Sequence, residues 1–245
     1  YYRGKLYVGI VLSGQDIDGE VVGTVGTDAN NKLIGKDLRG YVYEFDPVAQ
    51  NFAVRLDFSF DYNRERPWIP WGYSINSSLI RNSAGGQIER EIAEPIISDI
   101  EFDDVGNMLI AIRDRKGDQY AIDNNMYNGV LTHDEYASAG ELLRANATPT
   151  PTGCIYSIVT KPNTTDYYSD NIVHPESVQG SVAVLPGANE VLATVLDPIS
   201  GKVRAGGTIR FNNLTGNKVS NSAYEVFEDR ETNADPSIAA VSKAN

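Results

Sequence analysis

Short runs of apolar and β-branched residues, separated by turn-forming residues, recur along the whole chain. These runs are rich in Val, Ile, Tyr, Phe and Thr and are broken by Gly, Pro, Asn and Asp, which is the pattern of an all-β protein. The first run, Leu6–Val11, is typical of a buried strand. Helical periodicity is scarce. It is best at Thr132–Arg144, where Thr132 and Glu135 have capping-box spacing but Gly140 interrupts the pattern.

One short unit appears four times: an apolar residue, then Asp or Asn, then a turn-former, then a second strand. An Asp or Asn side chain can accept hydrogen bonds from backbone amides two residues later, and Gly supplies the positive φ that closes such a turn. Each unit therefore predicts a β-hairpin. The units begin at Phe45-Asp46, Phe102-Asp103, Leu196-Asp197 and Phe211-Asn212.

Repeated hairpins of one type favour the blades of a β-propeller, with a β-sandwich as the alternative. We expect about three to four blades in residues 1–245, which we interpret as part of a single domain. The hairpins are unevenly spaced, so we expect loop insertions near 16–36, 74–91 and 123–152. Both ends are interpreted as cuts within a longer polypeptide.

Charge and composition exclude several classes of function. The 245 residues carry 21 Lys and Arg against 33 Asp and Glu, a net charge of −12 that repels nucleic acids and anionic membranes. The longest apolar stretch, Leu6–Leu12, is too short to span a bilayer. Cys154 stands alone, so the chain is no disulfide scaffold.

Ile97–Asp103 ends in DIEFD, Gly106–Ile110 begins with GNM, and Arg113–Gln119 reads RDRKGDQ. These segments are similar to the DIEFD, GNM and RDR-x-GDQ signature of large bacterial surface proteins that carry SdrD B-like repeat domains. The likeness continues through Gly140–Ala145 and Gly206–Gly216. The resemblance implies a propeller-like region of an exported, cell-surface or extracellular protein. It also implies assembly with other surface proteins or with copies of the chain.

Four residues are candidate metal ligands. Asp99 and Glu101 precede the hairpin at Phe102, and His174 and Glu176 precede an apolar strand in an equivalent place. In a propeller such positions converge on the channel mouth, where carboxylates suit Ca²⁺ and a histidine favours a transition metal. The alternative, which we prefer, is that these side chains cap strand ends and bond loop amides, so that no cofactor is required.

Two further groups are candidate binding residues. Arg113, Asp114 and Asp118 lie in a charged turn that could brace two blades or form a binding rim. Trp68 and Trp71 alternate with prolines and could stack on glycans, although core packing is the preferred interpretation.

The sequence lacks the common catalytic motifs, including HExxH, G-x-S-x-G and the P-loop. We therefore expect a non-enzymatic structural or adhesion module of a bacterial surface protein. The alternatives are a metal-dependent hydrolase or lactonase of the propeller type and a carbohydrate-binding module.

Overall fold

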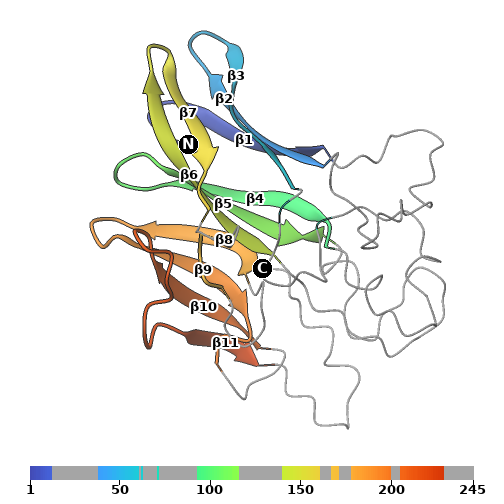
Figure 1. Ribbon diagram of the computed structural model, residues 1–245, viewed down its shortest axis with the longest axis vertical. Helices are drawn as coiled ribbons and strands as arrows, with labels where there is room; N and C mark the ends of the chain where they lie inside the picture. Colours follow the sequence, from blue (N-terminus) through green and yellow to red (C-terminus); the bar gives the residue numbers. More distant parts are fainter. Residues whose placement is uncertain are drawn as a thin grey trace, which may run out of the picture.

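The computed structural model describes residues 1–12, 38–60, 62, 71, 93–115, 140–160, 167–170, 178–199 and 205–228. These residues form eleven strands in three open antiparallel sheets, which confirms the all-β prediction. Figure 1 shows the sheets one after another, from the blue strands to the red ones. No helix within the described ranges is long and apolar enough to cross a membrane.

Each sheet is a meander in which neighbouring strands follow one another along the chain. The first sheet holds β1 (Leu6–Leu12), β2 (Arg39–Asp46) and β3 (Asn51–Ser59). The second holds β4 (Pro95–Phe102), β5 (Met108–Asp114), β6 (Glu141–Thr150) and β7 (Gly153–Ile158). The third holds β8 (Val178–Leu185), β9 (Glu190–Leu196), β10 (Ala205–Asn212) and β11 (Tyr224–Glu228).

The predicted Asp and Asn turns occur where the sequence places them. In three of the four units the side-chain Oδ1 accepts two backbone N–H groups: Asp46 from Val48 and Ala49, Asp103 from Val105 and Asn107, and Asn212 from Leu214 and Thr215. The fourth, Asp197, follows β9 with a positive φ of 47°. Since β9 pairs antiparallel with β10, this unit also joins two neighbouring strands.

The second sheet lies between the other two, and its strand β5 is buried on both faces. Met108, Ile110 and Ile112 of β5 belong to the core shared with the first sheet. Leu109 and Ala111 belong to the core shared with the third sheet. A strand with neighbours on both faces reads as a continuous apolar run, as this one does.

The first strand is only partly as predicted. The strand at β1 is confirmed, but its expected burial is wrong: Tyr7 and Val11 pack against the core, whereas Leu6, Ile10 and Leu12 are 46%, 46% and 52% exposed. Successive side chains of a strand point to opposite faces. Only one face of the first sheet meets the second sheet, so half of this apolar run remains at the surface.

The helical candidate Thr132–Arg144 forms no helix over its described residues, 140–144, and the rest of it lies outside the described residues. Residues from Glu141 pair with β5 as part of strand β6, and Leu142 and Leu143 are buried in the two different cores. Pairing with β5 outweighs the local helical pattern. Strand β6 also occupies the last part of the expected insertion 123–152. The expected insertions 16–36 and 74–91 lie outside the described residues.

Candidate functional site

The outward side of the first sheet is apolar across all three strands. The strand register aligns Leu6 with Phe45 and Phe52, and Val8 with Tyr43 and Val54, on one side of the sheet. We call this side the apolar face. It consists of Leu6, Val8, Ile10 and Leu12 on β1, Tyr41, Tyr43 and Phe45 on β2, and Phe52 and Val54 on β3.

Large side chains of the apolar face are accessible to solvent. Phe52 is 64% exposed, and Val54 is 46% exposed. The rings of Phe45 and Phe52 pack across the strands at 4.7 Å, and those of Tyr41 and Tyr43 lie 6.1 Å apart. Contiguous exposed apolar surface of this kind marks interaction sites in soluble proteins, so the apolar face is the principal candidate site.

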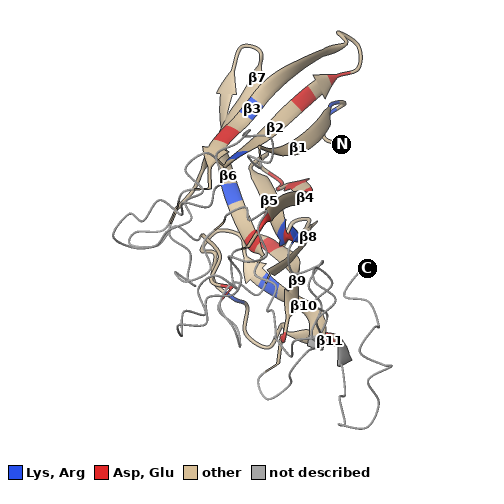
Figure 2. Cartoon of the chain, turned by 90° about the vertical axis from the view of Figure 1, so that its right-hand side faces the viewer, with Lys and Arg blue, Asp and Glu red and all other residues tan. Residues whose placement is uncertain are grey.

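The charge on this side of the first sheet is balanced. Arg39 and Asp57 lie on the same side as Tyr41, and the Arg39 guanidinium donates two hydrogen bonds to Asp57 Oδ1 at 2.9 and 2.5 Å. The hydrogen bond to Asp57 raises the pKa of Arg39. Strand β1 carries no charged residue and is tan along its length in Figure 2. The side is therefore neutral in a chain of net charge −12.

A polar cluster on the inner side fastens the first sheet to the second. Tyr7 Oη donates to Glu44 Oε2 at 2.7 Å, and Arg55 donates to Glu44 Oε1 at 2.8 Å. Arg55 also donates to the carbonyl of Thr152 in the second sheet at 2.8 Å. The pairing of β2 with β3 shifts register opposite Val42, and this bulge lets Arg55 reach the inner side.

Burial and the Glu44 bond together set the protonation of this cluster. Burial and then the hydrogen bond to Glu44 raise the pKa of Tyr7 far above its ordinary value. Burial works against ionisation of Glu44, but the bonds from Arg55 and Tyr7 outweigh it and lower the pKa of Glu44. The Glu44 carboxylate is therefore charged, and both of its oxygens accept hydrogen bonds within the cluster that holds the first sheet to the second.

The stability of the protein should fall at alkaline pH partly through Tyr156. Burial, followed by the nearby Cys154, raises the pKa of Tyr156 from 10.0 to about 12. The unfolded state then loses this proton before the folded state, so stability is lost as the pH rises from about 10 to about 12. We expect Tyr156→Phe to flatten this part of the decline.

Urea unfolding of both proteins at about pH 8 and about pH 11 measures the effect. The other tyrosines are present in both proteins, so the wild type serves as the reference. An equal loss of unfolding free energy in wild type and Tyr156→Phe would contradict the expectation.

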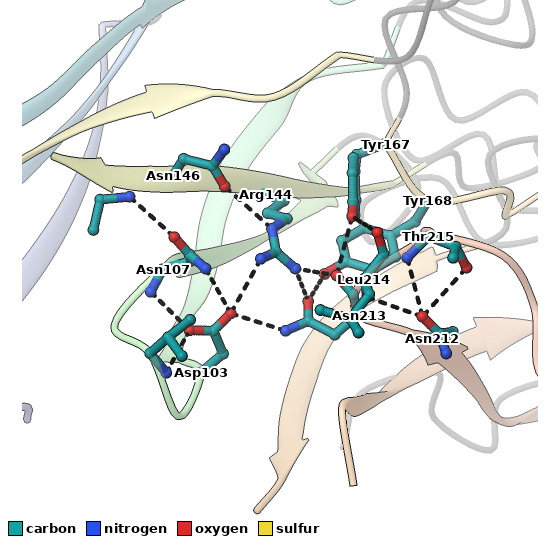
Figure 3. A network of polar contacts seen from close by, with 12 residues as sticks. Asp103, Asn107, Arg144, Asn146, Tyr167, Tyr168, Asn212, Asn213, Leu214 and Thr215 are labelled. Carbon is teal, nitrogen blue, oxygen red and sulfur yellow. Dashed lines mark hydrogen bonds and ion pairs between the residues drawn. The ribbon is translucent and has the colours of Figure 1, made fainter. Parts of the chain in front are cut away.

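A second buried cluster joins the second and third sheets (Figure 3). Arg144 of β6 is 3.3 Å from Asp103 Oδ2 and donates to Asn213 Oδ1 at 2.6 Å. Asn213 Nδ2 donates to Asp103 Oδ2 at 2.9 Å, which closes a triangle of buried side chains. Tyr168 Oη donates to Asn213 Oδ1 at 2.6 Å, and the Arg144 guanidinium lies 5.2 Å from the Tyr167 ring centroid.

The Asp103 carboxylate is fully occupied. Its Oδ1 accepts the turn amides, and its Oδ2 accepts from Asn107 and from Asn213 and forms an ion pair with Arg144. A carboxylate with this many donors is a structural centre rather than a base waiting for a substrate proton. This cluster was not predicted from the sequence, although a charged Arg144 inside the apolar run of β6 is the signal that marks it.

The candidate metal ligands are placed as follows. Asp99 Oδ2 accepts from the Val182 amide at 3.0 Å and from Ser181 Oγ at 3.2 Å, so this side chain bonds strand β8 of the third sheet. Burial and the charge of Asp99 raise the pKa of Glu101. His174 and Glu176 lie outside the described residues. The described part of the chain contains no group of three or more His, Cys, Asp or Glu able to hold a metal ion.

Two of the candidate binding residues, Trp71 and Asp114, are buried. Trp71 is 1% exposed and donates from Nε1 to Tyr62 Oη at 2.9 Å, so it serves the core and presents no ring to a glycan. Asp114 is fully buried and accepts from the Glu94 amide at 3.0 Å. Arg113 lies beside Gly180 of the third sheet. Trp68 and Asp118 lie outside the described residues.

Arg115, which follows the candidate residues Arg113 and Asp114, binds a carboxylate within the same sheet. Its Nε and Nη2 donate to Glu94 Oε2 at 2.8 and 2.5 Å. Glu94 directly precedes β4 and Arg115 directly follows β5, so this contact does not join two sheets.

Comparison of this chain with protein families, with curated proteins and with solved structures finds no match.

Proposed function

We propose that this chain is a protein-interaction module that binds its partner through the apolar face of the first sheet. The observation that carries the proposal is the exposure of that face: aromatic and aliphatic side chains line three paired strands, and the charged residues that the described strands place beside them, Arg39 and Asp57, form an ion pair. Interface cores are depleted in charge and enriched in aromatic residues. The face has this composition.

The proposal extends to the architecture, which we take to be an arc of three propeller blades. Each sheet is a meander in chain order, and the first strands of successive sheets lie together, β1 against β4 and β4 against β8. Asp or Asn turns recur in all three sheets. A two-layer sandwich would not require this serial arrangement, whereas radial repetition of blades does.

The proposed setting is the bacterial cell surface or the extracellular space. This part rests on the resemblance of Ile97–Asp103 and the following motifs to surface proteins, and on the acidic composition, which suits a soluble exposed surface. The hydrolase and glycan-binding alternatives receive no support from the geometry, because Asp99 bonds the third sheet and Trp71 is buried.

Site-specific photo-crosslinking in the source cells tests the binding role. Phe52→p-benzoylphenylalanine places the reactive group on the apolar face, and Val105→p-benzoylphenylalanine places it on a turn, where Val105 is 77% exposed. We expect protein adducts of defined mass from position 52 and none from position 105. Equal labelling at both positions, or no adduct at position 52, would refute the proposal.

A further inference from the structure

The described residues leave the stack of sheets with two open ends, and both expose large apolar side chains. One is the apolar face. The other is the outward side of the third sheet, where Tyr224 and Val226 of β11 are 68% and 65% exposed. The register places Thr208 opposite Tyr224, and Arg210 opposite Leu192, on this same side. We call this side the third-sheet end face.

The chain itself shows how such faces are covered. The first sheet packs on one face of the second sheet, and the third sheet packs on the opposite face. The contacts repeat in one direction, from β1 to β4 and from β4 to β8 (Figure 1). A third-sheet end face placed on an apolar face would continue this series.

We infer that two copies of the chain close into one ring of six sheets. The third-sheet end face of each copy packs on the apolar face of the other, so a single two-fold axis generates both contacts. Propellers typically have four to eight blades. The described residues of one chain form three sheets, and those of two copies form six, which lies within this range. This inference rests on the proposed function and names its partner.

The charges favour this pairing over other ways for two copies to meet. Each chain carries −12, so most surface patches repel their equivalents. Both open ends are exceptions, because each carries one internally balanced pair: Arg39 with Asp57 on one, and Arg210 with Glu190, at 2.8 Å, on the other. Added salt screens the remaining repulsion, so dimerisation should strengthen between low and moderate salt.

Sedimentation of the full chain and of two face variants tests the ring. The first variant carries Ile10→Glu with Phe52→Glu on the apolar face, and the second carries Tyr224→Glu with Val226→Glu on the third-sheet end face. We expect twice the chain mass of 26.8 kDa for the wild type and a single chain for each variant alone. Circular dichroism of each variant confirms folding, and Val105→Glu on the exposed turn should remain dimeric.

Mixing the two variants gives the sharpest result. The intact third-sheet end face of the first variant can meet the intact apolar face of the second, so a one-to-one heterodimer should reappear with one contact instead of two. A second variant that stays dimeric alone overturns the ring, because it would show two apolar faces meeting each other.

The outcome also separates this inference from the proposed function. A wild type that stays monomeric at chain concentrations up to about 100 µM overturns the ring, since weak interfaces already associate in the micromolar range. If position 52 then crosslinks to a different protein, the binding role stands and only the identity of the partner changes. If position 52 crosslinks to nothing, both fail.

Discussion

Replacing Arg144 by methionine is expected to destabilise the protein by roughly 3–5 kcal/mol, because one member of a buried ion pair is removed. Arg144 and Asp103 have side chains only 8% and 6% exposed, so Asp103 would remain charged, buried and short of a donor. Asn213 would lose the same donor, and with it a tie between the second and third sheets. Urea unfolding at neutral pH measures the change.

Arg210→Met is the matched control for this prediction. Arg210 pairs with Glu190 at 2.8 Å, but the two side chains are 39% and 21% exposed, and water can replace the lost partner. Exposed pairs contribute about 0–1 kcal/mol. Similar losses for Arg144→Met and Arg210→Met would mean that the cluster in Figure 3 does not brace the sheets.

Gly180→Ala is expected to destabilise the protein by roughly 2–5 kcal/mol through two separate effects. Gly180 lies in β8 with φ of +85°, a region that costs an alanine strain. A Cβ there would also lie 2.6 Å from Arg113 Cβ and 2.6 Å from Ser98 Oγ. Both neighbours belong to the second sheet, so the added methyl group would force the second and third sheets apart.

Gly187→Ala isolates the first effect from the second. Gly187 has a similar φ of +74°, but a Cβ there meets no atom within 4 Å. Its loss should be limited to backbone strain, about 1–2 kcal/mol. The difference between the two variants in thermal or urea unfolding then reports the clash alone. Equal losses would show that β8 can move away from the second sheet without cost.

The two largest predicted effects involve the same contact. Arg144 reaches the third sheet through Asn213, and Gly180 lets β8 approach β4 and β5, where Ser98 Oγ donates to the Gly180 carbonyl at 2.5 Å. Polar bridges and close backbone approach thus hold the second and third sheets together beside their shared apolar core. We therefore expect these two sheets to unfold as one unit.

Local features were predictable from the sequence because their causes are local. The turns at Asp46, Asp103 and Asn212 depend on a side chain bonding amides two to four residues away, and these contacts follow from the order of residues alone. The all-β class follows from many such turns between β-branched runs.

Features that depend on distant partners were decided only by the tertiary structure. Asp103 and Asn213 are 110 positions apart, and neither residue indicates the other in the sequence. Strand β6 replaced a helical pattern because β5 offered it a pairing edge. The run Leu6–Leu12 is apolar on both sides, so its pattern cannot say which side is buried. Packing against the second sheet covers one side and leaves the apolar face exposed, since burial depends on which neighbour arrives and not on the strand itself.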